Sequence, residues 1–178
     1  MGILRNLFGD TTSTNVLDLL TAQHTEMDEL FEQLEKGEGD RRTVLTELAD
    51  KLAAHATVEE KLFYPAIMSK DTNDKLQEAV QEHLQIKRML NDLVTMKLDD
   101  ESFKGKLQVL KEQNAHHAHK EEEHELFPIV RKAMTKDELA ALGNEVLVMF
   151  EELMTTHPSQ NLPRETTKAA PLPTPPAR

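Results

Sequence analysis

The sequence predicts an all-α protein: an antiparallel up-down four-helix bundle with an additional C-terminal helix. Leu, Ala, Glu, Lys, Met and Gln dominate the composition, and these residues are good helix formers. Aromatic residues that favour strands are scarce, with no Trp and one Tyr, and no glycine lies in an Asn-Gly or Asp-Gly hairpin turn. The 178 residues fit one domain of ordinary size.

Two helices are predicted in the first part of the chain. The first spans residues 15–36, where leucine, methionine and phenylalanine recur at three- and four-residue spacings. The glycines of "KGEGD" end it, and Asp40 is the predicted N-cap of the second helix. Pro65 is expected to stop or kink the second helix because proline lacks a backbone N–H.

Two further helices carry the same apolar period. The third is predicted to begin at Asp71 or Thr72. The fourth is predicted to follow Asp99 or Asp100 and to end between residues 128 and 134. Four long helices joined by short connections are typical of an up-down bundle.

A fifth helix is predicted from "TKDEL", in which Thr135 and Glu138 have the spacing of a capping box. Residues 156–178 are rich in Pro and Thr, lack an apolar period and are predicted to be a disordered tail. Residues 1–14 are expected to be a flexible N-terminal segment, although its "ILRNLF" could dock elsewhere. The bundle is therefore expected to comprise residues 15–155.

Composition also excludes several kinds of function. The chain has no cysteine, which excludes disulfides, thiolate metal sites and cysteine nucleophiles and favours a cytoplasmic location. No apolar run is long enough to span a membrane, and the N-terminus lacks the pattern of a signal peptide. A formal net charge of -11 argues against nucleic acid, because phosphate contacts need clustered Lys and Arg. No protein partner can be identified from these numbers.

Two stretches share an unusual pattern: "HATVEEKLFYP" at residues 55–65 and "HHAHKEEEHELFP" at residues 116–128. Each contains a histidine, a glutamate four residues on and a phenylalanine eight residues on, and each closes with a proline. The alignment pairs His55 with His119, Glu59 with Glu123 and Phe63 with Phe127. One such stretch carries little information, but two in the same register form a pattern.

The helices that precede these stretches also look related. His24 in the first helix and His83 in the third each precede a similar apolar series. The first two helices therefore resemble the next two, weakly in identity but consistently in register. This duplication adds one histidine to each half of the pattern.

The direction of these side chains predicts metal binding. Residues four apart share a helix face, so His55 and Glu59 are expected to point into the core, and likewise His119 and Glu123. Buried carboxylates and imidazoles without matching Lys or Arg are costly to desolvate. Metal cations resolve this problem, since neutral imidazole and carboxylate are their natural ligands.

The two-fold pattern predicts two metal ions. Each ion would take two histidines, and the two glutamates would bridge the ions, as in diiron carboxylate sites in helix bundles. Histidine-rich sites with open positions favour iron, although zinc and manganese are chemically possible. The predicted ligands are His24, His55, Glu59, His83, His119 and Glu123.

On these residues the chain resembles the hemerythrin-like, or HHE cation-binding, proteins. The resemblance covers residues 16–155, and its marks are His24, "HATVEEKLFYP", "EHLQIKRML" and "HKEEEHELFP". It implies a four-helix bundle around two non-haem iron ions with an oxo or hydroxo bridge. It also implies that the six residues named above are the metal ligands, with the two glutamates bridging.

The resemblance implies a protein that binds or senses O2, NO or peroxide at this centre. Alternatives from other classes stay open: an enzyme that decomposes peroxide or oxidises ferrous iron, an iron-storage or iron-donor protein, and a structural bundle that folds without metal. Whether the protein is an enzyme is therefore undecided at this stage.

One departure from the family pattern weakens simple oxygen carriage. Oxygen-carrying members have a second histidine four residues after the first on the third helix, whereas Lys87 follows His83 at that spacing here. A protonated lysine cannot bind a metal. The candidates for an additional ligand, or for a group beside the ligands, are His116, Glu112, Lys87 and Tyr64.

The other charged residues near the motifs are expected at the surface. His117 and His124 fall off the inner face of the fourth helix, and His157 belongs to the predicted tail. The neighbouring glutamates are interpreted as a solvated charge run: Glu60, Glu121, Glu122 and Glu125.

Overall fold

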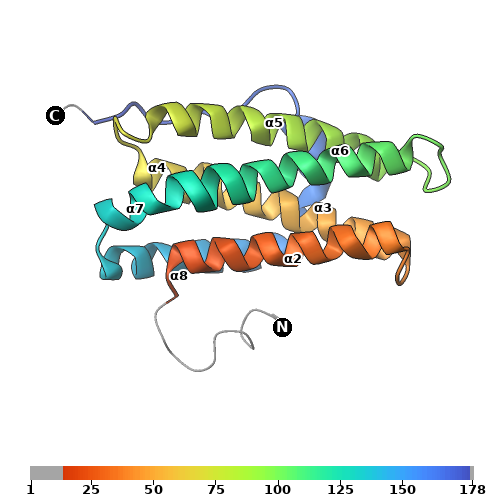
Figure 1. The fold of residues 1–178 in the computed structure, drawn as a ribbon, viewed down its shortest axis with the longest axis horizontal. Helices are drawn as coiled ribbons and strands as arrows, with labels where there is room; N and C mark the ends of the chain where they lie inside the picture. Colours follow the sequence, from red (N-terminus) through yellow and green to blue (C-terminus); the bar gives the residue numbers. More distant parts are fainter. Residues whose placement is uncertain (1–13, 177–178) are drawn as a thin grey trace.

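The computed structural model describes residues 14–176, and all regular secondary structure in that range is helical, as predicted. Four long helical segments lie side by side, and neighbours run in alternating directions (Figure 1). No helix within residues 14–176 is long and apolar enough to cross a membrane. The "ILRNLF" stretch and nearly all of the predicted segment 1–14 lie outside the described residues.

The first two helices begin and end close to the predicted residues. Helix α2 spans Val16–Lys36 and ends at Gly37, whose φ of 70° lies in the left-handed region that glycine adopts without strain. Helix α3 spans Arg41–Val58. The predicted N-cap is confirmed, since the Asp40 carboxylate accepts a hydrogen bond from the Thr43 N–H at 2.8 Å.

Helix α3 does not stop at the proline but continues through a change of helix type. It runs into the π-helix η1, Glu59–Phe63, and then into helix α4, Tyr64–Ile67. The Tyr64 N–H donates to the Glu59 carbonyl, five residues earlier, which is the hydrogen bond of a π-helix. Pro65 lies in the first turn of α4, directly after this change of helix type.

The second half of the bundle repeats this plan with a longer π-helix. Helix α5 spans Asn73–Thr95, and the next long segment is built from three consecutive helices. These are α6, Phe103–Ala115, the eleven-residue π-helix η2, His116–Leu126, and α7, Phe127–Ala133. The predicted fourth helix is therefore one continuous rod whose middle is more loosely wound than its ends.

Helix α8, Lys136–Met154, is the additional C-terminal helix. The predicted capping box is confirmed, since Thr135 and Glu138 each accept a hydrogen bond from the other's backbone N–H. Helix α8 crosses the start of α2 at close range. A Cβ atom on Gly143 would overlap the Thr14 carbonyl oxygen, so only glycine fits this crossing.

The apolar core consists of two clusters with a polar layer between them. On α2, for example, residues 16–20 belong to one cluster and residues 27–34 to the other. Gln23 and His24, both buried, lie in the interval between them. The apolar side chains of α3, α5 and the η2 segment divide in the same way. The fold therefore places a buried polar layer halfway along the four long segments.

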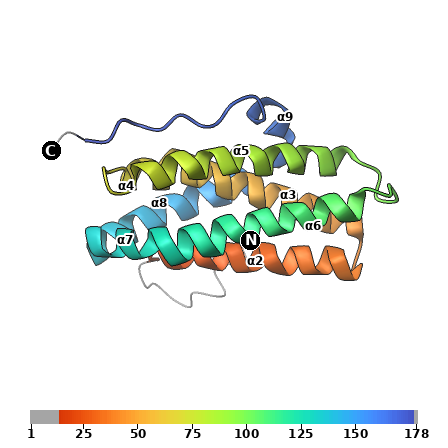
Figure 2. The ribbon, with the colours of Figure 1, turned by 45° about the horizontal axis from the view of Figure 1, so that its top comes forward.

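The structure differs from the disordered tail that composition predicts. A 3-10 turn, η3 (Pro158–Asn161), leads into the single turn α9, Leu162–Glu165, which packs against α5 (Figure 2). Leu162 is fully buried in the second apolar cluster. The Asp50 carboxylate accepts hydrogen bonds from the Ser159 N–H and hydroxyl at 3.1 and 2.6 Å. These contacts fix a segment whose local sequence has no helical period.

Candidate metal centre

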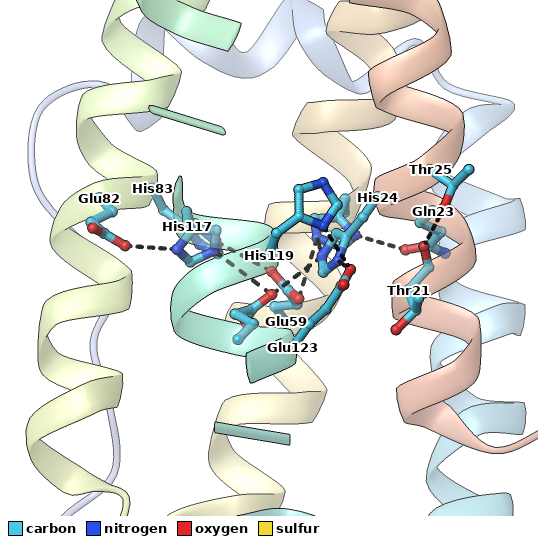
Figure 3. A network of polar contacts seen from close by, with 12 residues as sticks. Thr21, Gln23, His24, Thr25, Glu59, Glu82, His83, His117, His119 and Glu123 are labelled. Carbon is cyan, nitrogen blue, oxygen red and sulfur yellow. Dashed lines mark hydrogen bonds and ion pairs between the residues drawn. The ribbon is translucent and has the colours of Figure 1, made fainter. Parts of the chain in front are cut away.

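Six titratable side chains meet in the polar layer, and four of them are histidines (Figure 3). None is more than 4% exposed to solvent. All four long segments contribute, so the cluster depends on the whole bundle. Its members are His24 from α2, His55 from α3, Glu59 from η1, His83 from α5, and His117 and Glu122 from η2.

The four imidazoles form two pairs that face each other through Nε2. In the first half of the centre, the Nε2 atoms of His24 and His55 are 3.1 Å apart. In the second half, the Nε2 atoms of His83 and His117 are 3.0 Å apart. Two nitrogen ligands about 2.1 Å from one ion, at about a right angle, lie about 3.0 Å apart. Each pair therefore has the spacing of two ligands of a single ion.

Glu59 connects the two halves. Its Oε1 atom lies 3.3 Å from the Nε2 atom of His55 in the first half. Its Oε2 atom lies 3.2 Å from the Nε2 atom of His83 in the second half. One carboxylate thus presents a different oxygen to each histidine pair, which is the arrangement of a bridging ligand.

Glu122 also reaches both halves. Its Oε2 atom lies 3.3 Å from the Nε2 atom of His24 and 3.9 Å from that of His117. This Oε2 atom is buried and has no hydrogen-bond partner, and neither has Oε1 of Glu59. Buried carboxylate oxygens are rarely left unpaired, because the cost of desolvation is then uncompensated. A cation between the carboxylates would compensate it, so the residues fit a metal centre.

The outward-facing nitrogen of every histidine in the centre is also occupied. Each Nδ1 contacts an oxygen that can only accept, so each Nδ1–H is the donor. This hydrogen bond fixes the ring orientation and directs the Nε2 lone pair toward the centre, as in many metal sites. The pairs are His24 with Glu123 at 2.7 Å, His55 with Gln23 at 2.8 Å, His83 with Glu60 at 3.0 Å and His117 with Glu82 at 2.7 Å.

The two histidines of the first half differ in basicity. Burial opposes the charged form of His24, but the nearby carboxylates of Glu122 and Glu123 outweigh it and raise the pKa of His24 to about 9. Burial and the positive charge of His24 hold the pKa of His55 well below its usual value. His24 Nε2–H therefore donates to the neutral His55 ring in the metal-free protein.

The second half shows the same division. Burial again opposes the charged form of His83, but hydrogen bonds to Glu59 and Glu60 outweigh it and raise the pKa of His83. The pKa of His117 is lowered, mainly by burial. Each half thus combines one histidine that favours the doubly protonated form with one that favours the neutral form.

The two carboxyl groups divide in a related way. Burial raises the pKa of Glu59 well above its usual range, and the negative charge of Glu122 adds to this effect. Burial acts against ionisation of Glu122 too, but the neighbouring imidazoles of His117 and His24 outweigh it and lower its pKa. The metal-free centre therefore keeps protons at positions where a cation would replace them.

Tyr64 adds a hydroxyl to the second half only. It is fully buried, and its O–H donates to Oε1 of Glu122 at 2.9 Å. The hydroxyl oxygen lies 3.3 Å from Nε2 of His83 and 3.5 Å from Nε2 of His117. Burial and the charge of Glu122 raise the pKa of Tyr64 well above its usual value, so the group stays a phenol. The predicted candidate therefore lies among the proposed ligands.

The structure contradicts the predicted orientation of the fourth helix. His119 is 39% exposed and binds Asp28 at 2.7 Å, and Glu123 is 26% exposed, so both lie at the edge of the centre. His117 and Glu122, which were expected at the surface, are 2% and 1% exposed. The reason is η2: a π-helix is wound more loosely than an α-helix, with hydrogen bonds between residues five apart, so it turns His117 and Glu122 to the inner face.

Two of the additional candidates do not reach the centre. His116 has a side chain that is 48% exposed, and its Nε2 atom lies 3.0 Å from Oε1 of Glu121. Glu112 is exposed and accepts a hydrogen bond from Gln108 at 2.8 Å.

Lys87 points away from the centre but contacts one of its supports. It is 5% exposed, and its Nζ atom donates to both carboxylate oxygens of Glu60 at 3.0 and 2.8 Å. Glu60 is the residue that accepts from Nδ1 of His83. Glu165 of α9 lies 3.1 Å from Lys87 on its other side. Lys87 thus joins the C-terminal segment to the second half of the centre. Glu60 was expected in a solvated charge run, but it is held by Lys87 and His83.

A sequence signal for η2 does exist. Five buried positions follow each other at intervals of four: Leu110, Asn114, Ala118, Glu122 and Leu126. An α-helix has 3.6 residues per turn, so a strict interval of four over this length indicates a more loosely wound helix. Charged and polar members of the series conceal it from a search for apolar periodicity.

Comparison with known proteins decides the family. A family profile described as the hemerythrin HHE cation binding domain matches residues 15–130, well over half of the chain. The chain belongs to this family. Membership and the buried His/Glu groups together indicate that this hemerythrin HHE domain binds cations.

Two known proteins are similar to this hemerythrin HHE chain. A DNA nickase from Nostoc sp. is 24% identical over 138 residues, which cover 76% of this chain but 39% of the nickase. The chain therefore spans well under half the length of that relative. The crystal structure of a hemerythrin HHE cation binding domain-containing protein from Mycobacterium kansasii superimposes with a TM-score of 0.70, at 23% identity, over 80% of this chain and 88% of that one. The second similarity shows a shared fold.

Proposed function

We propose that the protein is a non-haem diiron protein that binds or senses a small ligand, namely O2, NO or peroxide. The observation that carries the proposal is the pair of facing imidazole pairs joined by two buried carboxylates with unpaired oxygens. We assign an antiparallel up-down four-helix bundle, with α8 added, as its scaffold. The proposed ligands are His24, His55, Glu59, His83, His117 and Glu122.

The donor set supports iron and an open centre. The first half offers two imidazole nitrogens and oxygens of Glu59 and Glu122, and the second offers two imidazole nitrogens and an oxygen of Glu59, with Glu122 Oε2 3.9 Å from His117. Imidazole and carboxylate suit iron, and six protein groups shared by two ions leave coordination positions open. When bound, the irons would supply the affinity for O2, NO or peroxide and any redox chemistry.

The chain's own residues control access and proton position. The buried apolar clusters on both sides exclude bulk water from the polar layer. The acceptors on the four Nδ1 atoms keep the rings aimed at the centre. The Tyr64 hydroxyl can donate a hydrogen bond or a proton to a small ligand in the second half. This phenol specifically favours a peroxide-decomposing enzyme as the second candidate function.

Charge and composition support a small ligand in preference to nucleic acid. The relative from Nostoc is named a DNA nickase, whereas this chain has a formal net charge of -11. An acidic chain repels phosphates unless Lys and Arg are gathered on one face. The complete lack of cysteine fits a cytoplasmic protein.

Metal content and the visible spectrum test the proposal. Protein loaded anaerobically with ferrous iron is expected to hold two irons per chain, and near-ultraviolet bands are expected to appear in air and to reverse on degassing. Irreversible oxidation, or gas release from added peroxide, would favour the enzyme. Rapid transfer of iron to a chelator would favour an iron donor. Fewer than two ions would contradict the diiron centre.

Glu122→Ala should lose metal, and Glu125→Ala, three residues further on, is the matched control.

A further inference from the structure

The proposed ligands are nearly inaccessible, yet a metal ion must reach them. A small surface cleft between α5 and η2 is lined by two of them, His117 and Glu122. Glu122 keeps a buried Oε2 atom without a hydrogen-bond partner, and this atom faces His24 and His117 of the centre. Glu121 lines the same cleft and is partly exposed. The cleft therefore lies directly beside the second half of the centre.

Three side chains that can bind a metal gather beside the cleft, and one of them, Glu121, also lines it. We call Glu82 from α5 and His116 and Glu121 from η2 the rim site. One ligand atom from each lies within 4.8 Å of the other two. Glu82 and His116 also line a neighbouring surface pocket of about 330 Å³, so the rim site is open to solvent.

The charges of the rim site are poorly compensated by protein groups. Within residues 14–176, no lysine or arginine nitrogen lies within 4.0 Å of either carboxylate. Glu121 is paired with His116 at 3.0 Å, and Glu82 with Nδ1 of His117 at 2.7 Å. Two carboxylates and an imidazole form an oxygen and nitrogen set that suits divalent first-row metals.

The rim site is in direct contact with the buried centre. Glu82 belongs to the rim site and also holds the His117 ring of the second half (Figure 3). Glu121 precedes Glu122 in η2, and both line the cleft. The rim site and the buried centre are therefore joined by the contact of Glu82 with His117 and by the adjacent residues Glu121 and Glu122.

We propose that Glu82, His116 and Glu121 form a second, solvent-accessible site for divalent cations that delivers metal to the buried centre through this cleft. The inference rests on the proposed function, since delivery requires a buried centre that takes up metal. Exposed ligands bind an ion weakly and release it readily, which suits passage. The metal in the proposed diiron protein is ferrous iron, and Co2+ is a coloured and oxidation-resistant probe.

Uptake of Co2+ by the metal-free full-length protein tests delivery. The variant His116→Ala/Glu121→Gln is expected to take up Co2+ about tenfold more slowly, because local carboxylates raise the encounter rate of cations. Its final content should stay at two ions per chain. Glu82 is left unchanged because it supports His117. The control His124→Ala/Glu35→Gln removes the same two group types elsewhere and should keep the wild-type rate.

A second measurement detects the rim site directly. Protein whose buried centre is filled with Zn2+ is titrated with Mn2+ and followed by electron paramagnetic resonance. One additional, weakly bound Mn2+ is expected, and it should be absent from His116→Ala/Glu121→Gln. Equal uptake rates in the variant and the wild type, or an unchanged Mn2+ signal in the variant, would overturn the rim site. Failure of the proposed function would differ, because the wild type itself would then take up fewer than two Co2+ ions.

Discussion

The two halves of the metal centre share a plan but differ in what lies beside it. In the first half, the Nε2 atoms of His24 and His55 lie beside imidazole and carboxylate groups. In the second half, the Tyr64 hydroxyl lies within 3.5 Å of both His83 and His117. The duplicated pattern in the sequence therefore ends in two inequivalent positions.

The difference indicates a division of labour. A position surrounded by fixed ligands holds an ion, whereas a position with a neutral hydroxyl beside it can also interact with an incoming ligand. The supports differ in the same sense. His55 is held by the neutral amide of Gln23, whereas His83 is held by Glu60, which is ion-paired with Lys87. We therefore expect the second half to be the reactive one.

The largest expected effect is the loss of the metal ion from the second half of the centre. His117→Ala should reduce the metal content from two ions per chain to one, because it removes one of the two imidazoles of that half. His119→Ala should keep both ions, since His119 lies at the edge and binds Asp28. Elemental analysis after gel filtration measures both. Loss of metal in the His119 variant alone would support the ligands predicted from α-helical spacing and contradict those assigned from η2.

Acidity should weaken both halves by a large factor. His24 has a pKa raised to about 9 and must lose its proton when a metal binds. Affinity for Co2+ should thus rise from pH 6 to pH 8, by up to about tenfold per pH unit for each proton displaced. The stability of the metal-free protein has the opposite dependence on pH. There His24 stabilises the fold fully below about pH 6.5, and this contribution is lost as the pH rises through about 9.

Calorimetric titration with Co2+ at several pH values, in buffers of different ionisation enthalpy, counts the protons released. A release of at least one proton per chain at pH 7 is expected. No release, together with a flat affinity, would show that the metal-free centre does not hold the protons described here.

Removing one hydroxyl should sharpen the contrast between the halves. Tyr64→Phe should keep two ions but weaken NO or azide binding about fivefold to tenfold, the usual effect of one lost hydrogen bond. Thr57→Val is the matched control, because it removes a buried hydroxyl that bonds only to the Ala53 carbonyl. Spectroscopic titration of both variants measures the effect. Equal affinities in the two variants would make the halves functionally alike.

The smallest effect is expected from the C-terminal segment. Glu165→Gln removes one of the two carboxylates that hold Lys87, and through Lys87 and Glu60 it should loosen His83. Release of one of the two ions to a chelator should become about twofold to threefold faster, in keeping with a partly exposed ion pair. Glu152→Gln, an exposed position on α8, is the control. Equally faster release of both ions would show that the substitution weakens the whole fold and not the second half alone.

Local sequence predicted most of the fold and part of the centre. The caps at Asp40 and Thr135 are confirmed, since capping depends only on residues a few positions away. The structure also brings together His24, His55 and His83 with Glu59, as expected from the duplicated pattern. These residues lie on, or directly after, ordinary α-helical turns.

The remainder depended on the type of helix. Counting back from Leu126 with α-helical spacing reaches Glu123 and His119, whereas η2 brings Glu122 and His117 to the inner face. A π-helix is less favourable than an α-helix in isolation, so it forms where tertiary contacts require it. The C-terminal segment is a similar case. Composition predicted disorder. The segment is held instead by contacts with residues far away in the sequence: one leucine is buried in the second apolar cluster, and Asp50 accepts hydrogen bonds from the segment.

The eleven residues of η2 also constrain how the chain can change in length. Removing one residue between His117 and Leu126 would turn everything downstream by roughly a quarter of a turn around the helix axis. Phe127 and Val130, both buried, would then leave the core. Insertions and deletions are tolerated in most connecting segments. Here the helices before and after η2 each have a buried face, and the length of η2 sets the angle between these faces. Its length is therefore as much a part of the metal centre as its histidines are.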